Sequence, residues 1–273
     1  MKGSVSVERR RVAAINDISG MGRCSLTVTL PVISAMGHQV CPLPTAVLSA
    51  HTGYKSYEFI DLTDSMPALL QSWDKLGFIP DAVYTGFLGS EKQIEPVLSY
   101  LKKHKNSLII VDPVMGDDGV IYKTYTKDMC ERMRALCAEA DVITPNLTEA
   151  CILTGLAYPE NPTEKDINEI AAALKKVARG NFVITGVKIN GALFSFGYDG
   201  EFFKVSHEYI ELPVCGAGDL FASLLCGYLL SGEGFKAAVK KSGDFLTDAL
   251  KYTRECKADP KDGIVFEPLL KTL

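Results

Sequence analysis

The segment S-L-I-I-V-D-P-V-M-G-D, residues 107–117, joins the most apolar strand pattern of the chain to a polar turn. Residues 108–111 do not alternate between apolar and polar side chains. A run of this kind is typical of a strand that is covered on both faces, as strands of parallel sheets are. The segment therefore predicts an internal strand of a parallel sheet, with Asp112 directly after its carboxyl end.

Similar short runs recur on both sides of this segment. Their sequences are R-V-A-A-I-N (11–16), Q-V-C-P-L-P-T-A-V-L (39–48), D-A-V-Y-T-G (81–86), D-V-I-T-P-N (141–146) and N-F-V-I-T-G (181–186). Helical patterns lie between them near 25–36, 65–76, 91–104, 126–139 and 163–178. Two short strands around a Tyr-Asp-Gly turn (191–206) and two helices near 217–231 and 234–255 follow. This alternation predicts an α/β fold with a mostly parallel central sheet.

Length and composition predict one globular domain over residues 1–273, with residues 1–10 as a flexible N-terminal extension. Of the 273 residues, 47% are hydrophobic, and no repeat or linker interrupts the pattern. The net charge of −4 argues against a nucleic-acid partner. No apolar run is long enough to span a membrane, and the apolar stretch that follows the N-terminal basic residues is too short for a signal peptide. The eight cysteines are scattered without a C-x-x-C pair, so we expect reduced thiols and a cytoplasmic protein that binds a small molecule.

The sequence G-A-G-D (216–219) opens a strongly apolar helical pattern. The first amides of a helix have no partner within the helix, and together with the helix dipole they attract anions such as phosphate. Asp219 would then lie beside that anion, where a carboxylate can accept the proton of an attacking hydroxyl group. The alternative is that Asp219 only caps the helix.

Three carboxylates are candidate magnesium ligands: Asp112, Asp117 and Glu149. Strands of an open α/β sheet present their carboxyl ends to the ligand at one edge, and Mg²⁺ binds carboxylates together with substrate phosphates. Each candidate also has a purely structural interpretation. Residues 112–117 could form a turn, and Asn146 with Glu149 could form a capping box.

Three loops could contact the substrates. Residues 16–22 lack the G-x-G-x-x-G pattern of dinucleotide-binding loops, and Ser19 could simply cap a helix. His51, Thr52 and Tyr54 could hold a flat heteroaromatic ring, or be ordinary loop residues. Thr185 and Gly186 follow a strand and could contact a nucleotide.

In this order, five motifs resemble the pyridoxal kinase branch of the ribokinase-like superfamily, from residue 15 to about residue 252. They are H-T-G-Y (51–54), T-G-F-L-G-S (85–90), D-P-V-M-G-D (112–117), T-P-N-L-T-E (144–149) and G-A-G-D (216–219). The resemblance implies a three-layer α/β/α ribokinase-like fold without a separate lid domain. It also implies ATP-dependent phosphorylation of the 5′-hydroxymethyl group of pyridoxal, pyridoxine or pyridoxamine. Mg²⁺, a homodimer and support of nucleotide binding by K⁺ belong to the same expectation.

The resemblance also assigns roles to single residues. It implies a catalytic base at Asp219, which would also contact the vitamin, and an anion hole at Gly216, Ala217 and Gly218. It implies vitamin contacts at Asp17, His51, Thr52, Gly53 and Tyr54, nucleotide contacts at Thr144, Gly216 and Gly218, and a nucleotide and metal network at Asp112 and Glu149. From their positions in the sequence we add Ser19 as a vitamin contact, Asn146, Thr185 and Gly186 as nucleotide contacts, and Asp117 as a metal ligand.

One residue departs from this pattern, because Asp17 stands where many relatives have a serine. The sequence D-I-S-G (17–20) is also similar to the opening of hydroxymethylpyrimidine kinases, although those usually carry cysteine in place of Asp219 and lack H-T-G-Y. Two alternatives therefore stay open, a hydroxymethylpyrimidine kinase and a non-catalytic protein that binds a vitamin B6 phosphate.

Overall fold

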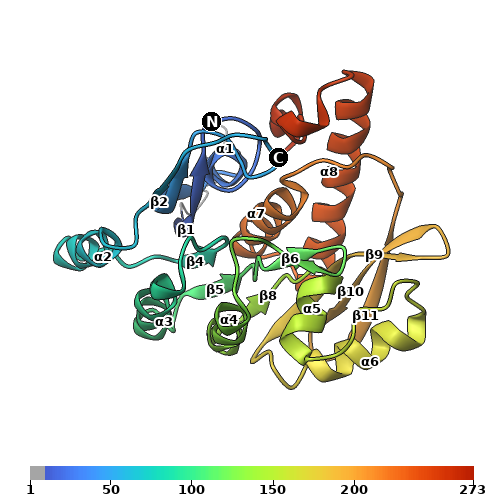
Figure 1. Cartoon of the computed structure of the whole chain (residues 1–273), viewed down its shortest axis with the longest axis horizontal. Coiled ribbons are helices and arrows are strands. Elements are labelled where there is room, and N and C mark those ends of the chain that lie inside the picture. The colour runs from blue at the N-terminus through green and yellow to red at the C-terminus, as the bar shows by residue number, and fades with distance from the viewer. Residues whose placement is uncertain (1–9) are drawn as a thin grey trace, which may run out of the picture.

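The computed structural model describes residues 10–273, so the predicted N-terminal extension lies outside the described residues except for Arg10. Its centre is a nine-stranded sheet in the order β11-β10-β9-β8-β5-β4-β1-β2-β3 (Figure 1). The strands are β1 (Arg11–Ser19), β2 (Gln39–Leu48), β3 (Phe59–Asp61), β4 (Ala82–Thr85), β5 (Leu108–Val111), β8 (Val142–Ile143), β9 (Asn181–Ile189), β10 (Ala192–Tyr198) and β11 (Phe202–His207). The six strands from β9 to β2 are parallel, and β3, β10 and β11 are antiparallel to their neighbours. The predicted mostly parallel sheet is confirmed.

Helices cover both faces of the sheet and complete the three layers (Figure 1). One face carries α1 (Leu26–Ala35), α7 (Ala217–Leu230) and α8 (Phe235–Glu255). The other carries α2 (Met66–Lys75), α3 (Ile94–Lys103), α4 (Lys127–Glu139), α5 (Leu147–Thr154) and α6 (Glu164–Leu174). Short 3-10 helices are η1 (Glu91–Gln93), η2 (Pro260–Asp262) and η3 (Glu267–Thr272). No separate lid domain is present among residues 10–273.

The lack of alternation in the strands has a direct structural cause. Along β1, Val12 and Ala14 pack in the apolar cluster shared with α1 and α7, and Ala13 and Ile15 pack in the cluster on the opposite face. All four side chains are completely buried. Because successive side chains of a strand point to opposite faces, a strand between two helix layers must be apolar at every position.

The strands β3, β6 (Gly116–Asp117) and β7 (Val120–Ile121), the helix α5 and the 3-10 helices η2 and η3 were not among the predicted elements. The edge strand β3 is exposed and has only three residues, and the hairpin of β6 and β7 has only two residues in each strand, so all three strands are too short to show a pattern in the sequence. Helix α5 lies where the sequence suggested only a capping box of Asn146 and Glu149. All eight cysteines are free thiols. Within residues 10–273, no helix combines the length and the apolar character that crossing a membrane requires.

Candidate active site

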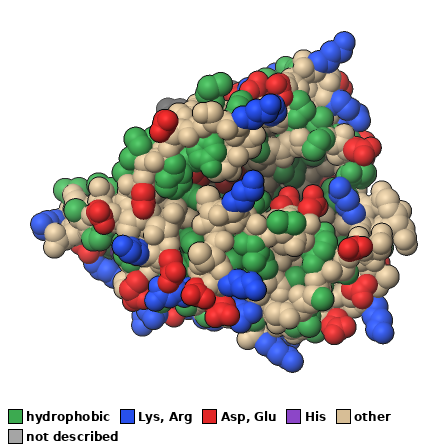
Figure 2. Space-filling model, viewed as in Figure 1, with side chains coloured by type: hydrophobic (Ala, Val, Ile, Leu, Met, Phe, Trp, Pro, Cys, Tyr) green, Lys and Arg blue, Asp and Glu red, His purple; other side chains and the backbone are tan. Residues whose placement is uncertain are grey.

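The carboxyl-terminal parts of β1 and β5 lie next to the first turn of α7, and their neighbours β4 and β8 end at the same edge of the sheet. The predicted polar rim is therefore assembled from segments that lie far apart in the chain. Figure 2 shows the surface hollowed in front of α7 and α8, with acidic and basic side chains along the edge of the hollow. A ligand site at this edge is the usual arrangement of open α/β sheets.

The start of α7 is shaped by Gly216. Its φ of 81° is left-handed, and a Cβ atom there would lie 2.0 Å from the carbonyl oxygen of Arg23. Only glycine satisfies both conditions. The turn directs the first amides of α7 toward the edge of the sheet, where Gly218 is exposed and Gly216 and Ala217 are partly exposed. These amides can therefore stabilise an anion.

Asp219 lies in the first turn of α7 and is held by two donors. Nδ2 of Asn16 donates a hydrogen bond to Oδ1 of Asp219 over 3.2 Å. The backbone N–H of Ser25 is the second donor. Burial and the nearby carboxylate of Asp17 raise the pKa of Asp219 to about 6, although both hydrogen bonds act in the opposite direction. The group is therefore mostly ionised at neutral pH, yet basic enough to accept a proton.

Asp112 lies opposite this turn. Oγ1 of Thr144 donates to Oδ1 of Asp112 over 2.8 Å, whereas Oδ2 lies 3.9 Å from the point where Gly218 would carry a Cβ atom. Burial, followed by the charge of Asp219, raises the pKa of Asp112 to about 7. The predicted nucleotide residues Asp112 and Thr144 are therefore next to the glycine turn.

Glu149 forms the capping box that the sequence offered as the alternative. Its Oε2 accepts from the N–H of Asn146 (2.8 Å), and Oδ1 of Asn146 accepts from the N–H of Glu149 (2.9 Å). Its Oε1 accepts from the N–H of Met115 (3.0 Å). Burial and the charge of Asp112 raise the pKa of Glu149 well above its usual range. The structural role is present, and it leaves the carboxylate close to Asp112.

Asp117 is placed differently. It is exposed on β6, and its Oδ1 accepts from the N–H of Asp118. Within residues 10–273, no three His, Cys, Asp or Glu side chains form a group that could hold a metal ion by themselves. The donor set still suits Mg²⁺, because Asp112 and Glu149 are hard oxygen donors whose buried charges repel each other. Mg²⁺ commonly uses one or two carboxylates and takes its other ligands from phosphates and water.

The vitamin side of the rim contains Asp17 and Ser19 at the end of β1. Both are buried, and Oγ of Ser19 donates to Oδ2 of Asp17 over 2.9 Å. Burial raises the pKa of Asp17, and hydrogen bonds from Ser25 and Ser19 lower it. Oδ1 of Asn16 accepts from the backbone N–H groups of Asp17 and Phe87, so the end of β1 is fixed against β4.

The loop of residues 51–54 has its polar groups engaged by the protein. Nε2–H of His51 donates to the carbonyl of Lys261 over 2.6 Å, and Nδ1 accepts from the N–H of Gly53 over 3.1 Å. The hydroxyl of Tyr54 donates to Oδ1 of Asp262 over 2.7 Å. Thr52 and Gly53 are exposed. The vitamin contacts predicted for this loop stay predictions.

Thr185 and Gly186 lie on β9 at the far side of the rim. The N–H of Thr185 donates to the carbonyl of Pro145 over 2.9 Å, and Thr185 forms a bridge with Asn146. Gly186 is exposed with a φ of 68°, and the space around it is open. Nδ2 of Asn146 donates to the carbonyl of Gly116. The side chain of Asn146 is therefore committed to the protein, and its predicted nucleotide contact is untested.

The two donors to Asp219 were not predicted: Asn16 was considered only as part of the loop of residues 16–22, and Ser25 was not considered as a site residue. Ser25 precedes α1 with φ 53° and ψ −135°, a strained backbone for a residue other than glycine, and this conformation delivers its N–H to Asp219. A signal for Asn16 was available, because a polar residue that ends an apolar strand and has no helix to cap needs a buried partner.

Comparison with known proteins identifies the family of this chain. The family model for phosphomethylpyrimidine kinase matches residues 32–264. The chain belongs to this family. Its curated relatives include a pyridoxal kinase of Histophilus somni, 30% identical over 83% of each chain. Another is a pyridoxine kinase of Bacillus subtilis, 29% identical over 86% of this chain and 80% of the relative. The resemblance to the pyridoxal kinase branch is confirmed.

Solved structures agree with the curated relatives. A Bacteroides thetaiotaomicron protein classed with the phosphomethylpyrimidine kinases, whose orthorhombic crystal form contains pyridoxal, matches with a TM-score of 0.92 and 38% identity, over 97% of this chain and 96% of that chain. A pyridoxal kinase of Lactobacillus plantarum matches with a TM-score of 0.91 and 30% identity, over 96% of each chain. The three-layer ribokinase-like fold is therefore confirmed as well.

Proposed function

We propose that this chain is an ATP-dependent phosphotransferase that phosphorylates the 5′-hydroxymethyl group of pyridoxal, pyridoxine or pyridoxamine, a reaction of vitamin B6 salvage. The observation that carries the proposal is the carboxyl group of Asp219, held by Asn16 and Ser25 in the first turn of α7. Its pKa of about 6 suits a general base, which works best with a pKa near the working pH. The vitamin B6 kinases among the relatives, and the relative that holds pyridoxal, support the choice of acceptor.

The residues around the glycine turn have complementary tasks in this reaction. Asp219 accepts the proton of the 5′-hydroxyl group as that oxygen attacks the γ-phosphorus of ATP, and the bond from this phosphorus to the bridging oxygen breaks to release ADP. The amides of Gly216, Ala217 and Gly218 stabilise the negative charge of the transferred phosphoryl group. Asp112 and Glu149 would hold Mg²⁺, which neutralises phosphate charge when it is bound. Catalysis then consists mainly of positioning and electrostatic stabilisation.

Asp17 and Ser19 are the proposed recognition groups for the vitamin ring. An ionised carboxylate only accepts hydrogen bonds, so Asp17 favours a ring with a protonated nitrogen or a hydroxyl group, and pyridoxal has both. We keep Thr52, Gly53 and Tyr54 as further contacts. The two nitrogens of His51 are engaged by the protein, so we expect it to shape the loop.

The rival acceptor is hydroxymethylpyrimidine, and it has specific support. The family model carries the phosphomethylpyrimidine kinase name, and D-I-S-G (17–20) resembles the opening of hydroxymethylpyrimidine kinases. Against it stand the aspartate at position 219, where those kinases usually have cysteine, and the H-T-G-Y loop. Three further expectations accompany the proposal and stay predictions: a homodimer, a cytoplasmic location and support of nucleotide binding by K⁺.

Identification of the product tests the proposal. The purified protein is incubated with MgATP and pyridoxal, and ³¹P NMR detects the new phosphate ester. We expect a signal coupled to the 5′-methylene protons and stoichiometric ADP. A protein that binds pyridoxal and MgATP but forms no ester with any of the three vitamers would be the non-catalytic relative, and the proposal would be wrong.

A further inference from the structure

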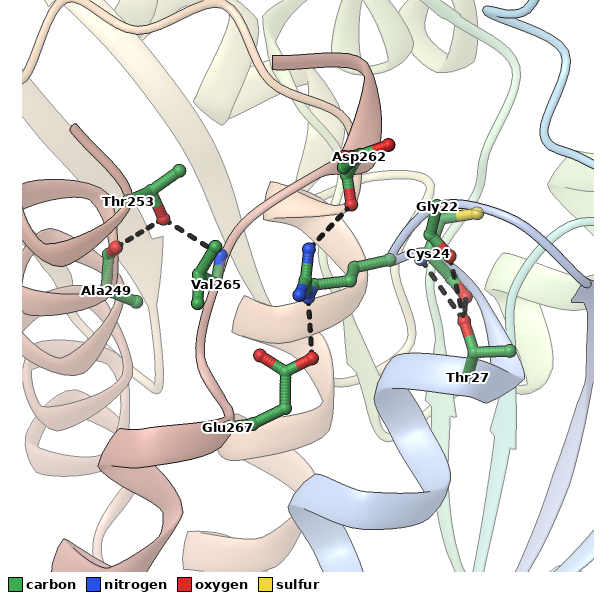
Figure 3. Close-up of polar contacts among 9 residues, drawn as sticks. Gly22, Cys24, Thr27, Ala249, Thr253, Asp262, Val265 and Glu267 are labelled. Atoms are coloured by element: carbon green, nitrogen blue, oxygen red, sulfur yellow. Dashed lines mark hydrogen bonds and ion pairs between the residues drawn. The ribbon is translucent and has the colours of Figure 1, made fainter. Parts of the chain in front are cut away.

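The segment Asp259–Glu267 leaves the end of α8 and returns to the vitamin side of the active site. There it meets the loop Gly20–Ser25 at Arg23. The N–H of Arg23 and its Nη1 both donate to the carbonyl of Asp262, over 3.0 Å and 3.1 Å. Nε of Arg23 donates to Oε1 of Glu267 over 2.6 Å (dashed lines at Asp262 and Glu267 in Figure 3). Arg23, in the loop Gly20–Ser25, is therefore held both at its backbone and along its side chain.

The same segment also holds the second substrate loop, His51–Tyr54. The carbonyl of Lys261 accepts from His51, and Oδ1 of Asp262 accepts from the hydroxyl of Tyr54. The segment thus bridges two loops that are not neighbours in sequence. Asp262 contributes its backbone to one loop and its side chain to the other.

The segment is itself firmly anchored to the helix layer. Oγ1 of Thr253 donates to the carbonyl of Ala249 over 2.7 Å and accepts from the N–H of Val265 over 2.9 Å (Figure 3). Ile264 and Phe266 are 1% and 2% exposed in the apolar cluster with α1, α7 and α8. The loops are therefore held by a fixed support.

Arg23 connects this support to the proposed catalytic groups. Its carbonyl oxygen packs against Gly216, and two residues further on Ser25 donates its N–H to Asp219. The ion pair between Arg23 and Glu267 is partly exposed, and such pairs contribute little to stability. The ion pair joins the loop Gly20–Ser25 to the anchored segment, so it is suited to holding that loop in position.

We propose that the segment Asp259–Glu267 is a positioning element of the vitamin site, which holds the loops Gly20–Ser25 and His51–Tyr54 through Arg23, Asp262 and Glu267. The inference rests on the proposed function. It identifies positioning residues at the carboxyl end of the chain, distant in sequence from all the motifs that indicated the activity.

The variants Asp262→Ala and Glu267→Ala test the proposal, with Glu91→Ala as the matched control. The control also removes an exposed ion pair, between Glu91 and Arg132 at 3.0 Å, on the opposite helix layer. For each of the first two variants we expect a rise of about 3- to 10-fold in the KM for pyridoxal, because one hydrogen bond to a charged group that orders the loop is lost. The KM for MgATP and the melting temperature should match those of the control.

Hydrogen exchange of residues 20–25 and 51–54 provides a readout that does not depend on activity. Compared with the control, we expect faster exchange of residues 51–54 in the Asp262 variant, which loses the acceptor of Tyr54, and faster exchange of residues 20–25 in the Glu267 variant, which loses the acceptor of Arg23. Unchanged exchange and an unchanged KM for pyridoxal would overturn the inference, as would equal increases of both KM values. If the wild-type protein turns over no vitamer, the proposed function fails, and the exchange experiment still decides whether the segment positions the loops.

Discussion

Replacement of Asn16 by aspartate should convert the donor that holds Asp219 into a competing carboxylate. The side chain of Asn16 is completely buried, and its Oδ1 already accepts from the N–H groups of Asp17 and Phe87. An aspartate of the same shape keeps these two bonds. The contact of 3.2 Å between Nδ2 and Oδ1 of Asp219 then becomes a contact between two acceptor oxygens.

The expected shift follows from the repulsion between the two carboxylates. Two unit charges about 4 Å apart at an effective dielectric constant of about 20 repel by about 4 kcal/mol, which corresponds to about 3 pKa units. Asp219 is partly exposed, so solvent screens part of this repulsion, and we expect a rise of roughly 1–2 units in its pKa. A base must be ionised to act. The acid limb of the pH profile should therefore move from near pH 6 to roughly pH 7–8.

The assay is the pH dependence of kcat/KM for pyridoxal at saturating MgATP, from about pH 5 to about pH 9. We expect turnover to fall about 2- to 10-fold near pH 7 and to recover near pH 9. Asn190→Asp, in the turn between β9 and β10, is the control, because it adds the same charge far from the site at a φ of 49° that aspartate tolerates. A limb that stays near pH 6, or a loss that is equal at every pH, would refute the role of Asn16 and of Asp219 as the base.

Four further predictions concern single residues or the whole protein. Asp219→Asn should lower kcat by about 10²–10⁴-fold and leave the Kd of MgATP, measured by calorimetry, unchanged; near-normal turnover would remove Asp219 from the base role. Glu149→Gln should raise the Mg²⁺ concentration needed for half-maximal rate and lower the free energy of unfolding by about 1–3 kcal/mol, because one backbone N–H loses its acceptor; a change in stability alone would leave only the capping box. Asp17→Ala should lower kcat/KM for pyridoxal by roughly 10- to 100-fold, and Asp17→Ser should recover part of it; equal effects on ATP and vitamin would reduce Asp17 to a turn residue. Without Mg²⁺, the melting temperature should fall as pH rises from about 4 through about 7. The reason is that Asp112 and Asp219 bind protons more tightly in the folded protein than in the unfolded chain. A melting temperature that rises over this pH range would contradict the raised pKa values.

Much of the fold was predictable because burial leaves a pattern in the sequence. The strand at Leu108–Val111 lies between two helix layers and must be apolar throughout. Its sequence therefore indicated both that it is a strand and that it is covered on both faces. The hairpin of β6 and β7 carries no such pattern, since its residues are few and face different surroundings. Short elements are fixed by their neighbours in space, which local sequence does not encode.

In the candidate site, too, the features that depend on local sequence were predictable and the long-range contacts were not. Gly216 and Asp219 were recognisable because the glycine conformation and the helix start are local requirements. The side-chain donor to Asp219 is Asn16, 203 residues away, and the support of the substrate loops comes from Asp262 and Glu267. Contacts of this kind depend on the tertiary arrangement, so they became visible only when the segments were placed side by side.

The central claim is that the protein phosphorylates a form of vitamin B6, and a comparison of acceptor substrates tests it most directly. ADP release at saturating MgATP is measured with pyridoxal, pyridoxine, pyridoxamine and hydroxymethylpyrimidine, in the wild-type protein and in Asp219→Asn as the blank. The proposed function predicts the highest kcat/KM for one of the three B6 vitamers and loss of that rate in the variant. A higher kcat/KM for hydroxymethylpyrimidine than for every vitamer, or ADP release that is the same in both proteins, would contradict it.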